Sequence, residues 1–340
     1  MIVGRYSRED TGTCKSTNEK IKSGLLLVKG NVSSDADKKI HLGDTDGLPC
    51  ILGDQHNSLK RLIGGGGSGV KMNDGTLVFP VEGTQKESNK TVSLIIHSRD
   101  TASWTLSKGM SADGCSDPSV VEREKDKLMM MTACDDGRRR VYESGDKGES
   151  WTEALGTLSR VWSNRKGGEA KSVGSGVIKA TIGGDGDDKK RDVMLVTLPV
   201  YPEKDNERRT CKLHLWLTDN THIVDIGPVS GEGENVAASS LLYKSGNDVE
   251  GETNDNKEEL IALYEKKGGE GKPSPDMVSV RLTAELQRVK KVLKTWKKVD
   301  ERVSSLCPTL LSVKGTSAAT ACSAGKITAG LVGFFVRQLL

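Results

Sequence analysis

The chain has 340 residues, with 50 Lys and Arg against 47 Asp and Glu, a hydrophobic fraction of 35%, an aromatic fraction of 4%, and 39 glycines. A membrane span is excluded because no run of about 18 apolar residues occurs. Collagen, coiled-coil and small disulfide-rich proteins are also excluded, because the glycines are aperiodic, the heptads are local and the seven cysteines are sparse.

Short β-like runs separated by turn signals fill most of the chain. The strongest hairpin signal is Asn73-Asp74-Gly75, which lies between the runs 69–72 and 76–81. Strands that meander at this spacing favour a propeller, a barrel or a sandwich. In chain order, the predicted strands are residues 25–28, 69–72, 76–81, 92–97, 127–131, 140–142, 175–180, 193–198, 213–217, 239–243 and 259–264.

Three polar segments between these runs, residues 183–192, 244–258 and 266–276, are predicted to be solvated surface loops. The aspartates of the first segment lack the ligand spacing of a calcium-binding EF-hand. The cysteines form no C-x-x-C pair and the five histidines share no ligand spacing, so we expect neither a metal nor a cofactor. The disulfide pairing stays open at this stage.

From Val278 the apolar period changes from two residues to three or four. Leu282, Leu286, Val289 and Leu293 begin this pattern, and most of the lysines between residues 290 and 298 lie on the opposite side. The pattern predicts one amphipathic helix that ends near residue 304. A membrane-surface role is one interpretation of such a basic face, and we favour a helix packed on the β-domain with its lysines in water.

One short motif carries more information than the strand pattern. Ser144-Gly-Asp146-Lys-Gly148-Glu-Ser-Trp151 fits S-x-D-x-G-x-x-W, the Asp box. In this motif the glycine permits the turn, the aspartate can hold backbone N–H groups and the tryptophan fills the gap between sheets. A second copy at residues 98–104 is one residue shorter and lacks the glycine, which indicates a repeat.

Longer segments resemble a known family. They are residues 107–118, 138–146, 153–162 and 215–220, and they are similar to the trypanosome trans-sialidase superfamily, which holds active trans-sialidases and many inactive surface glycoproteins. The resemblance implies an all-β fold in which residues 1–277 form a partial six-bladed sialidase-type β-propeller without its N-terminal blades. Residues 278–307 would be the connecting helix, and residues 308–340 a linker with the truncated start of a lectin-like domain.

The resemblance also allows the catalytic positions to be compared one by one. Retaining sialidases bind the sialic acid carboxylate with three arginines and attack with a tyrosine that a glutamate deprotonates. The glutamate position is occupied by Asp117, one arginine position by Ala133, and the other by Thr210, with Arg209 one residue away. Ala238 stands at the position of the tyrosine nucleophile. Asp117 is therefore the one catalytic group retained among these positions.

These substitutions lead to three hypotheses. The first is a catalytically inactive trans-sialidase-like surface glycoprotein, an adhesin or antigen that contacts host glycans or proteins. The second is residual exo-α-sialidase activity that uses Asp117 and Arg209. The third, which we rank almost level with the first, is a degenerate gene fragment whose product does not fold.

Location and partners are expected from the family alone. The family implies the cell surface, although neither a signal peptide nor an anchor signal occurs in the chain as given. Asn31 and Asn89 begin glycosylation sequons, which have meaning only in the secretory pathway. Acidic and basic residues alternate along the chain, so no nucleic-acid partner is expected.

Overall fold

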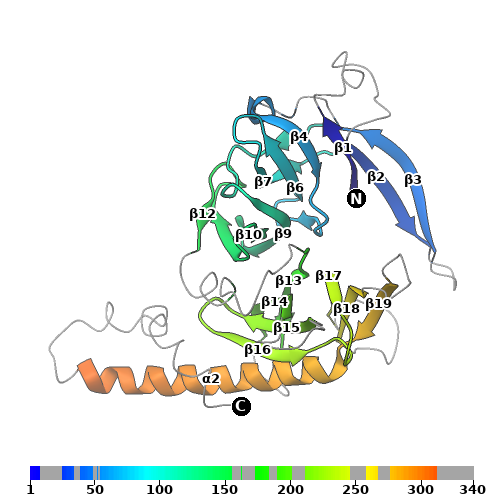
Figure 1. The fold of residues 1–340 in the computed structure, drawn as a ribbon. Coiled ribbons are helices and arrows are strands. Elements are labelled where there is room, and N and C mark those ends of the chain that lie inside the picture. The colour runs from blue at the N-terminus through cyan, green and yellow to red at the C-terminus, as the bar shows by residue number, and fades with distance from the viewer. Residues whose placement is uncertain are drawn as a thin grey trace. The chain divides into compact units, whose positions relative to one another are not determined.

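The computed structural model divides into two compact units, Met1–Glu153 with Ala170–Ser175 and Ala154–Glu169 with Gly176–Leu340 (Figure 1). Each unit is described here by itself. The structure describes residues 1–7, 25–33, 39–48, 52, 54–154, 162, 173–183, 190–200, 211–245, 258–266 and 276–311.

The first unit begins with an antiparallel sheet of order β3-β2-β1-β4-β6-β7-β8. The first half of β1 pairs with β2 and its second half with β4, so β1 joins two parts of this sheet. A short 3₁₀ helix, Asp54–Ser58, precedes β4. The strands are β1 (Ile2–Ser7), β2 (Leu25–Val32), β3 (Ile40–Gly47), β4 (Leu59–Gly64), β5 (Val70–Lys71, paired with β6), β6 (Leu77–Gln85), β7 (Thr91–Ser98) and β8 (Thr105–Leu106).

A second sheet of the first unit has the simple order β12-β11-β10-β9. Its strands are β9 (Cys115–Glu124), β10 (Lys127–Cys134), β11 (Arg139–Ser144) and β12 (Thr152–Glu153). Leu128, Met130 and Tyr142 of this sheet pack with Val78 and Ile95 of the first sheet in one buried cluster. The two sheets therefore share a core.

The second unit contains two sheets and one long helix. The order of the first sheet is β13-β14-β15-β16, and that of the second is β17-β18-β19. The elements are β13 (Val177–Ile182), β14 (Arg191–Val200), β15 (Lys212–Thr218), β16 (Ile223–Pro228), β17 (Val236–Lys244), β18 (Glu259–Lys266), β19 (Asp276–Arg281) and α2 (Thr283–Leu311). Helix α2 lies against β16 and β18 (Figure 1).

The apolar stripe of α2 explains its place on the sheets. Leu286, Val289, Leu293 and Trp296 are at most 9% exposed and belong to the same cluster as the inner residues of β13–β18. Burying such side chains stabilises the fold by about 1.5–3 kcal/mol each. The helix is therefore part of the core of the second unit.

The predicted all-β architecture with one amphipathic helix is confirmed for the described residues. The Asn73-Asp74-Gly75 turn joins β5 to β6, with a bond from the backbone N–H of Met72 to the oxygen of Thr76. The two four-stranded sheets, β9–β12 and β13–β16, each run up and down in the manner of a propeller blade. The number of six blades stays a prediction, as do the domain limits.

The structure has several strands that the sequence analysis did not predict: β1, β3, β4, β8, β9, β12 and β16. In addition, residues 278–281 were assigned to the helix although they lie in β19. Val278 and Val280 continue the apolar spacing of the helix, and pairing of β19 with β18 fixes their strand conformation. Most of the three predicted loops, at residues 184–189, 246–257 and 267–275, lies outside the described residues.

No helix among the described residues has the length and apolar character needed to cross a membrane.

Candidate functional site

Asp117 lies at an irregularity in β9. Met131 pairs with Ser119 and Ala133 pairs with Ser116, so two residues of β9 stand opposite Thr132. Asp117 has a φ of 51°, in the left-handed region. Its backbone N–H donates to Glu82 Oε1 at 2.8 Å, and its carboxylate accepts a bond from Ser116 Oγ at 2.7 Å. Bulges of this kind re-aim side chains next to functional sites.

Glu82 is a residue that the sequence analysis missed. It lies in β6, one residue beyond the predicted strand 76–81, and no motif marks it. Burial raises the pKa of Glu82, the N–H of Asp117 opposes this, and the negative charge of Asp117 raises the pKa further. The result is a pKa above the ordinary glutamate value. Two acidic residues, Glu82 and Asp117, are therefore in contact at the irregularity in β9.

Ala133 lies in the same sheet as Asp117, directly opposite Ser116 and Arg139. It is 5% exposed, and its carbonyl accepts a bond from Ser116 Oγ at 3.5 Å. The structure thus brings the Asp117 and Ala133 positions together. A methyl group there supplies neither a positive charge nor a hydrogen-bond donor for a carboxylate.

The arginines that follow β10 have protein partners. The guanidinium of Arg139 donates to Ser175 Oγ at 2.7 Å and to the carbonyl of Val173 at 3.2 Å. Arg140 pairs with Asp136 at 3.1 Å and with Glu153 at 3.6 Å. These contacts hold neighbouring segments together, so neither side chain replaces an arginine at position 133.

Ala238 lies in β17 of the second unit, where the register with β18 shifts between Val236 and Ser239. The next residue, Ser239, shares a hydrogen bond of 2.9 Å with Thr197 Oγ1. Ala238 itself carries only a methyl group and has no atom that can act as a nucleophile. Thr210 and Arg209, the other expected site positions in this part of the chain, lie outside the described residues.

The structure also answers the disulfide question in part. Cys115 of β9 and Cys134 of β10 are directly opposite in the sheet and are joined by a disulfide. This bond lies two residues from Asp117 and one residue from Ala133, so it fixes the strand pair that carries both. Cys211 is buried with a free thiol, which donates to the carbonyl of Val236 at 3.0 Å.

The turn between β11 and β12 contains the residues assigned to the Asp box. Ser144 Oγ accepts the N–H of Gly148 at 2.7 Å, and Asp146 accepts both the N–H and the hydroxyl of Ser150 at 2.9 and 2.6 Å. Gly148 has a φ of 88°, and a Cβ there would meet Ile95 at 2.8 Å. Trp151 packs against the buried cluster of the first unit.

The shorter copy between β7 and β8 has a closely similar bonding pattern. Ser98 Oγ accepts the N–H of Thr101 at 2.9 Å, and Asp100 accepts the N–H groups of Ala102 and Ser103 at 2.9 and 2.7 Å. This turn has one left-handed residue, Thr101, whereas the longer turn has both Lys147 and Gly148. The shorter turn thus has one left-handed position fewer, and the one it keeps is filled by Thr101, a β-branched residue for which this conformation is unusual.

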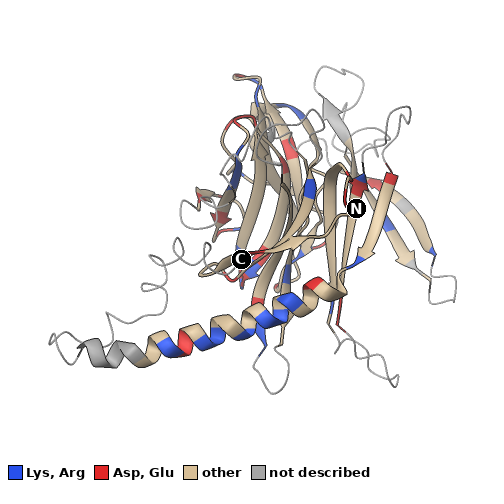
Figure 2. Ribbon diagram, turned by 60° about the horizontal axis from the view of Figure 1, so that its bottom comes forward, with Lys and Arg blue, Asp and Glu red and all other residues tan. Residues whose placement is uncertain are grey.

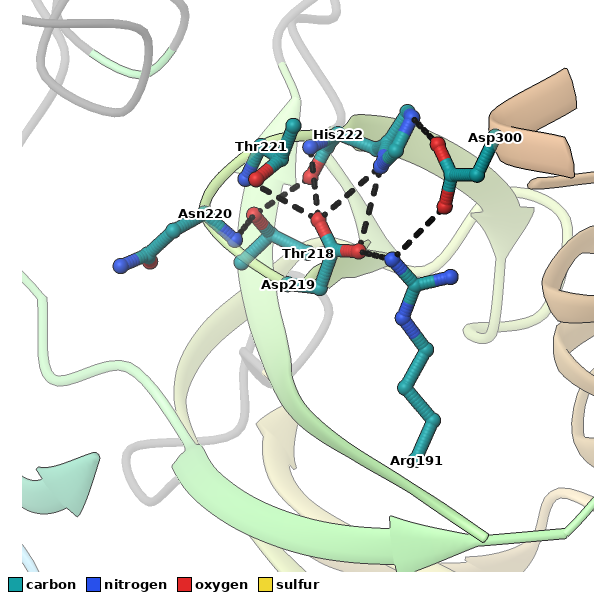
Figure 3. Close-up of polar contacts among 7 residues, drawn as sticks. All are labelled: Arg191, Thr218, Asp219, Asn220, Thr221, His222 and Asp300. Atoms are coloured by element: carbon teal, nitrogen blue, oxygen red, sulfur yellow. Dashed lines mark hydrogen bonds and ion pairs between the residues drawn. The ribbon is translucent and has the colours of Figure 1, made fainter. Parts of the chain in front are cut away.

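A third aspartate turn lies at the same place in the next complete sheet, between β15 and β16 (Figure 3). Asp219 Oδ1 accepts the N–H groups of Thr221 and His222 at 3.0 and 2.7 Å. The Asp219 carboxylate also pairs with Arg191, and His222 contacts Asp300 of α2 at 3.4 Å. An aspartate turn thus lies between the third and fourth strands of three successive blades, that is, between β7 and β8, β11 and β12, and β15 and β16.

Both predicted glycosylation positions are accessible. Asn31 lies in β2 and Asn89 in the turn between β6 and β7, and both side chains are exposed. The assignment of these sequons stays a prediction.

Comparisons with known proteins agree on the relationship. Residues 1–265 match the model of a BNR repeat-like domain. The chain is 36% identical over 294 residues to Sialidase 85-1.1 of Trypanosoma cruzi and 34% identical over 254 residues to a second sialidase of that organism. Its fold is similar to that of Trypanosoma rangeli sialidase, with a TM-score of 0.64 at 32% identity.

The similarity covers most of this chain and a smaller part of each relative. The match to Sialidase 85-1.1 covers 83% of this chain and 36% of that protein, and the match to the second sialidase covers 74% and 20%. The structural match to the Trypanosoma rangeli enzyme covers 88% of this chain and 44% of that one. The chain thus spans less than half the length of the relatives it matches.

Proposed function

The chain belongs to the family of BNR repeat-like domains and is related to the trypanosome sialidases, and on this basis we propose that it is a catalytically inactive, sialidase-like module of a surface glycoprotein. In this proposal the module contacts glycans or proteins on a host cell and does not turn over a sialoside.

The observation that carries the proposal is Ala238. Sialidases are an exception to the usual pair of catalytic carboxylates because their nucleophile is a tyrosine. Alanine at that position can neither attack the anomeric carbon nor form a glycosyl–enzyme bond. Loss of a nucleophile typically lowers turnover by several orders of magnitude.

The surroundings of Asp117 also support an altered specificity. Sialic acid is an anion at neutral pH, and a carboxylate is best bound by a guanidinium. Here a methyl group at Ala133 replaces that group, while Asp117 and Glu82 place two acidic side chains nearby. Their negative charge disfavours a carboxylate ligand, so we propose that the ligand is not bound through a sialic acid carboxylate at this point.

A hydrolysis assay tests the catalytic part of the proposal. We expect the purified chain, at high concentration with a fluorogenic sialoside, to give no release above the uncatalysed rate. Hydrolysis that disappears in Asp117→Asn would contradict the proposal and favour residual sialidase activity. A variant of the exposed residue Asp113→Asn serves as a control, because Asp113 lies outside the assigned positions.

A thermal melt tests both the fold and the ligand. A cooperative transition is expected, and excess sialyllactose should not move its midpoint. A ligand at 100 times its dissociation constant would stabilise the folded state by about 2.7 kcal/mol. A surviving sialic acid site would therefore raise the midpoint measurably. A chain without any cooperative transition would favour the third hypothesis, a product that does not fold.

A cell-binding assay tests the proposed contact with host cells and its independence of sialic acid. The fluorescently labelled protein is expected to bind mammalian cells, and prior removal of sialic acid from those cells is expected to leave binding unchanged. Binding that requires cell-surface sialic acid would contradict the altered specificity proposed for the site around Asp117 and Ala133.

A further inference from the structure

Lys and Arg positions recur along the length of α2 (Figure 2). Arg288, Lys291, Lys294, Lys298 and Arg302 are all exposed. At 3.6 residues per turn they fall within an arc of about 120°, and the row is about 21 Å long at 1.5 Å per residue. We call these five residues the basic row.

The basic row is not neutralised by the acidic residues around it. None of its five members has an ion-pair partner among the residues that the structure describes, whereas Lys290, off the row, pairs with Glu258 at 2.8 Å. The described helix has three acidic residues, of which Glu285 lies in the first turn and Asp300 contacts Arg191 and His222. Glu301, at the edge of the row, is the third.

The opposite face of α2 decides which kind of anionic partner fits. A helix that lies in a membrane interface inserts its apolar face among the lipids. The apolar face of α2 is already buried against the sheets through Leu286, Val289, Leu293 and Trp296. Apart from Val299, the exposed side of the helix therefore offers mainly charge, along one side of its axis, which matches a linear polyanion better than an acyl-chain surface.

We propose that the basic row of α2 is a binding site for a linear sulfated polysaccharide. Successive members are three or four residues apart, so their charges recur about once per turn along one side of the helix. A sulfated chain carries anionic groups at regular intervals and can lie along this side of the helix, with each bound cation releasing a counterion. This site is independent of the catalytic positions and goes beyond the proposed function, because it needs neither Asp117 nor a sialic acid.

The experiment uses the whole chain and a heparin decasaccharide as the probe, with affinity measured by calorimetry at several salt concentrations. The variant is the triple charge reversal Lys291→Glu, Lys294→Glu and Lys298→Glu. We expect about a tenfold or greater loss of affinity and a salt dependence whose slope shrinks by about 2–3, as counterion release predicts. The matched control reverses Lys86, Lys90 and Lys125, three exposed lysines in turns of the first unit, and should bind as the wild type does.

Three outcomes would overturn the proposal: unchanged affinity in the row variant, an equal loss in the matched control, or binding to phosphatidylserine vesicles without binding to the decasaccharide. The last result would assign the row to a membrane surface instead. Circular dichroism of each variant confirms that the helix is intact. If the charge reversal prevents folding, the triple change of the same lysines to glutamine removes the charge without repulsion, and the same loss is expected.

Discussion

The aspartate turns after β11 and β15 lie at the same position in two blades, but their aspartates make different contacts. In the first, Asp146 is exposed, and its side chain bonds to Ser144 and Ser150 of its own turn. In the second, the Asp219 side chain is 5% exposed and bonds to Arg191 and His222, which both reach Asp300 of α2. A repeated turn thus closes a hairpin locally in one blade and attaches a helix in another.

The difference follows from the residues that each aspartate can reach. Asp219 follows Thr218 directly, whereas Asp146 is two residues beyond Ser144. The carboxylate therefore lies differently with respect to the preceding hydroxyl group in the two turns. His222 then stacks on Trp296 with ring centroids 4.8 Å apart. Polar bonding and apolar packing therefore meet at one point of contact between sheet and helix.

The largest expected effect is at Asp219. Asp219→Ala removes the buried partner of Arg191 and His222, and breaking a buried ionic pair typically costs about 3–5 kcal/mol. We expect the lower figure, about 3 kcal/mol, because Arg191 remains one-third exposed. Denaturant unfolding measures it, with Asp146→Ala as the matched variant at about 1 kcal/mol. Equal losses in the two variants would show that Asp219 has only a local role.

A middle-sized effect is expected at Gly148. Alanine there combines a φ of 88° with a Cβ that would lie 2.8 Å from Ile95, so we expect a loss of about 2 kcal/mol in unfolding free energy. Gly145, in the same turn, has nothing within 4 Å of its Cβ position. Gly145→Ala should therefore stay within about 0.5 kcal/mol of the wild type. If both variants were equally stable, the turn would not depend on its glycine.

The smallest effect is a difference in acid stability. Burial by itself would raise the pKa of Asp219, but the hydrogen bonds from His222 and the charges of His222 and Arg191 lower it further than burial raises it. Such a carboxyl contributes stability that is complete above its unfolded pKa of about 3.9 and is lost as the pH falls through the folded value. Below about pH 4 the wild type should therefore lose stability more steeply than Asp219→Asn. Parallel curves from denaturation at several pH values would refute this.

Sequence patterns predicted the fold better than the element boundaries. Short apolar runs such as residues 92–97 and 193–198 are strands, and their residues 92–96 and 193–198 are all buried, as expected of a short apolar run bounded by turn signals. β9 escaped prediction because it contains Pro118 and ends in charged residues. β19 was assigned to the helix because side-chain spacing does not reveal that its backbone pairs with β18.

The site residues show a similar limit. Ala133 and Ala238 were assigned by their place in a family motif, and these two assignments stay predictions. Glu82 could not be assigned in this way, because its contact with Asp117 joins residues 35 positions apart and depends on the irregular pairing of β9. The disulfide between Cys115 and Cys134 likewise required the register of two strands, which seven scattered cysteines do not define.

The stacking of His222 on Trp296 has an optical consequence. The ring planes are 20° apart, and the guanidinium carbon of Arg191 lies 5.9 Å from the indole centre. Imidazole and guanidinium groups close to an excited indole change its emission, so the fluorescence of Trp296 depends on whether α2 lies on its sheet. The difference spectrum between the wild type and Trp296→Phe isolates this one side chain from the other four tryptophans. The protein thus carries a built-in, label-free reporter of helix attachment.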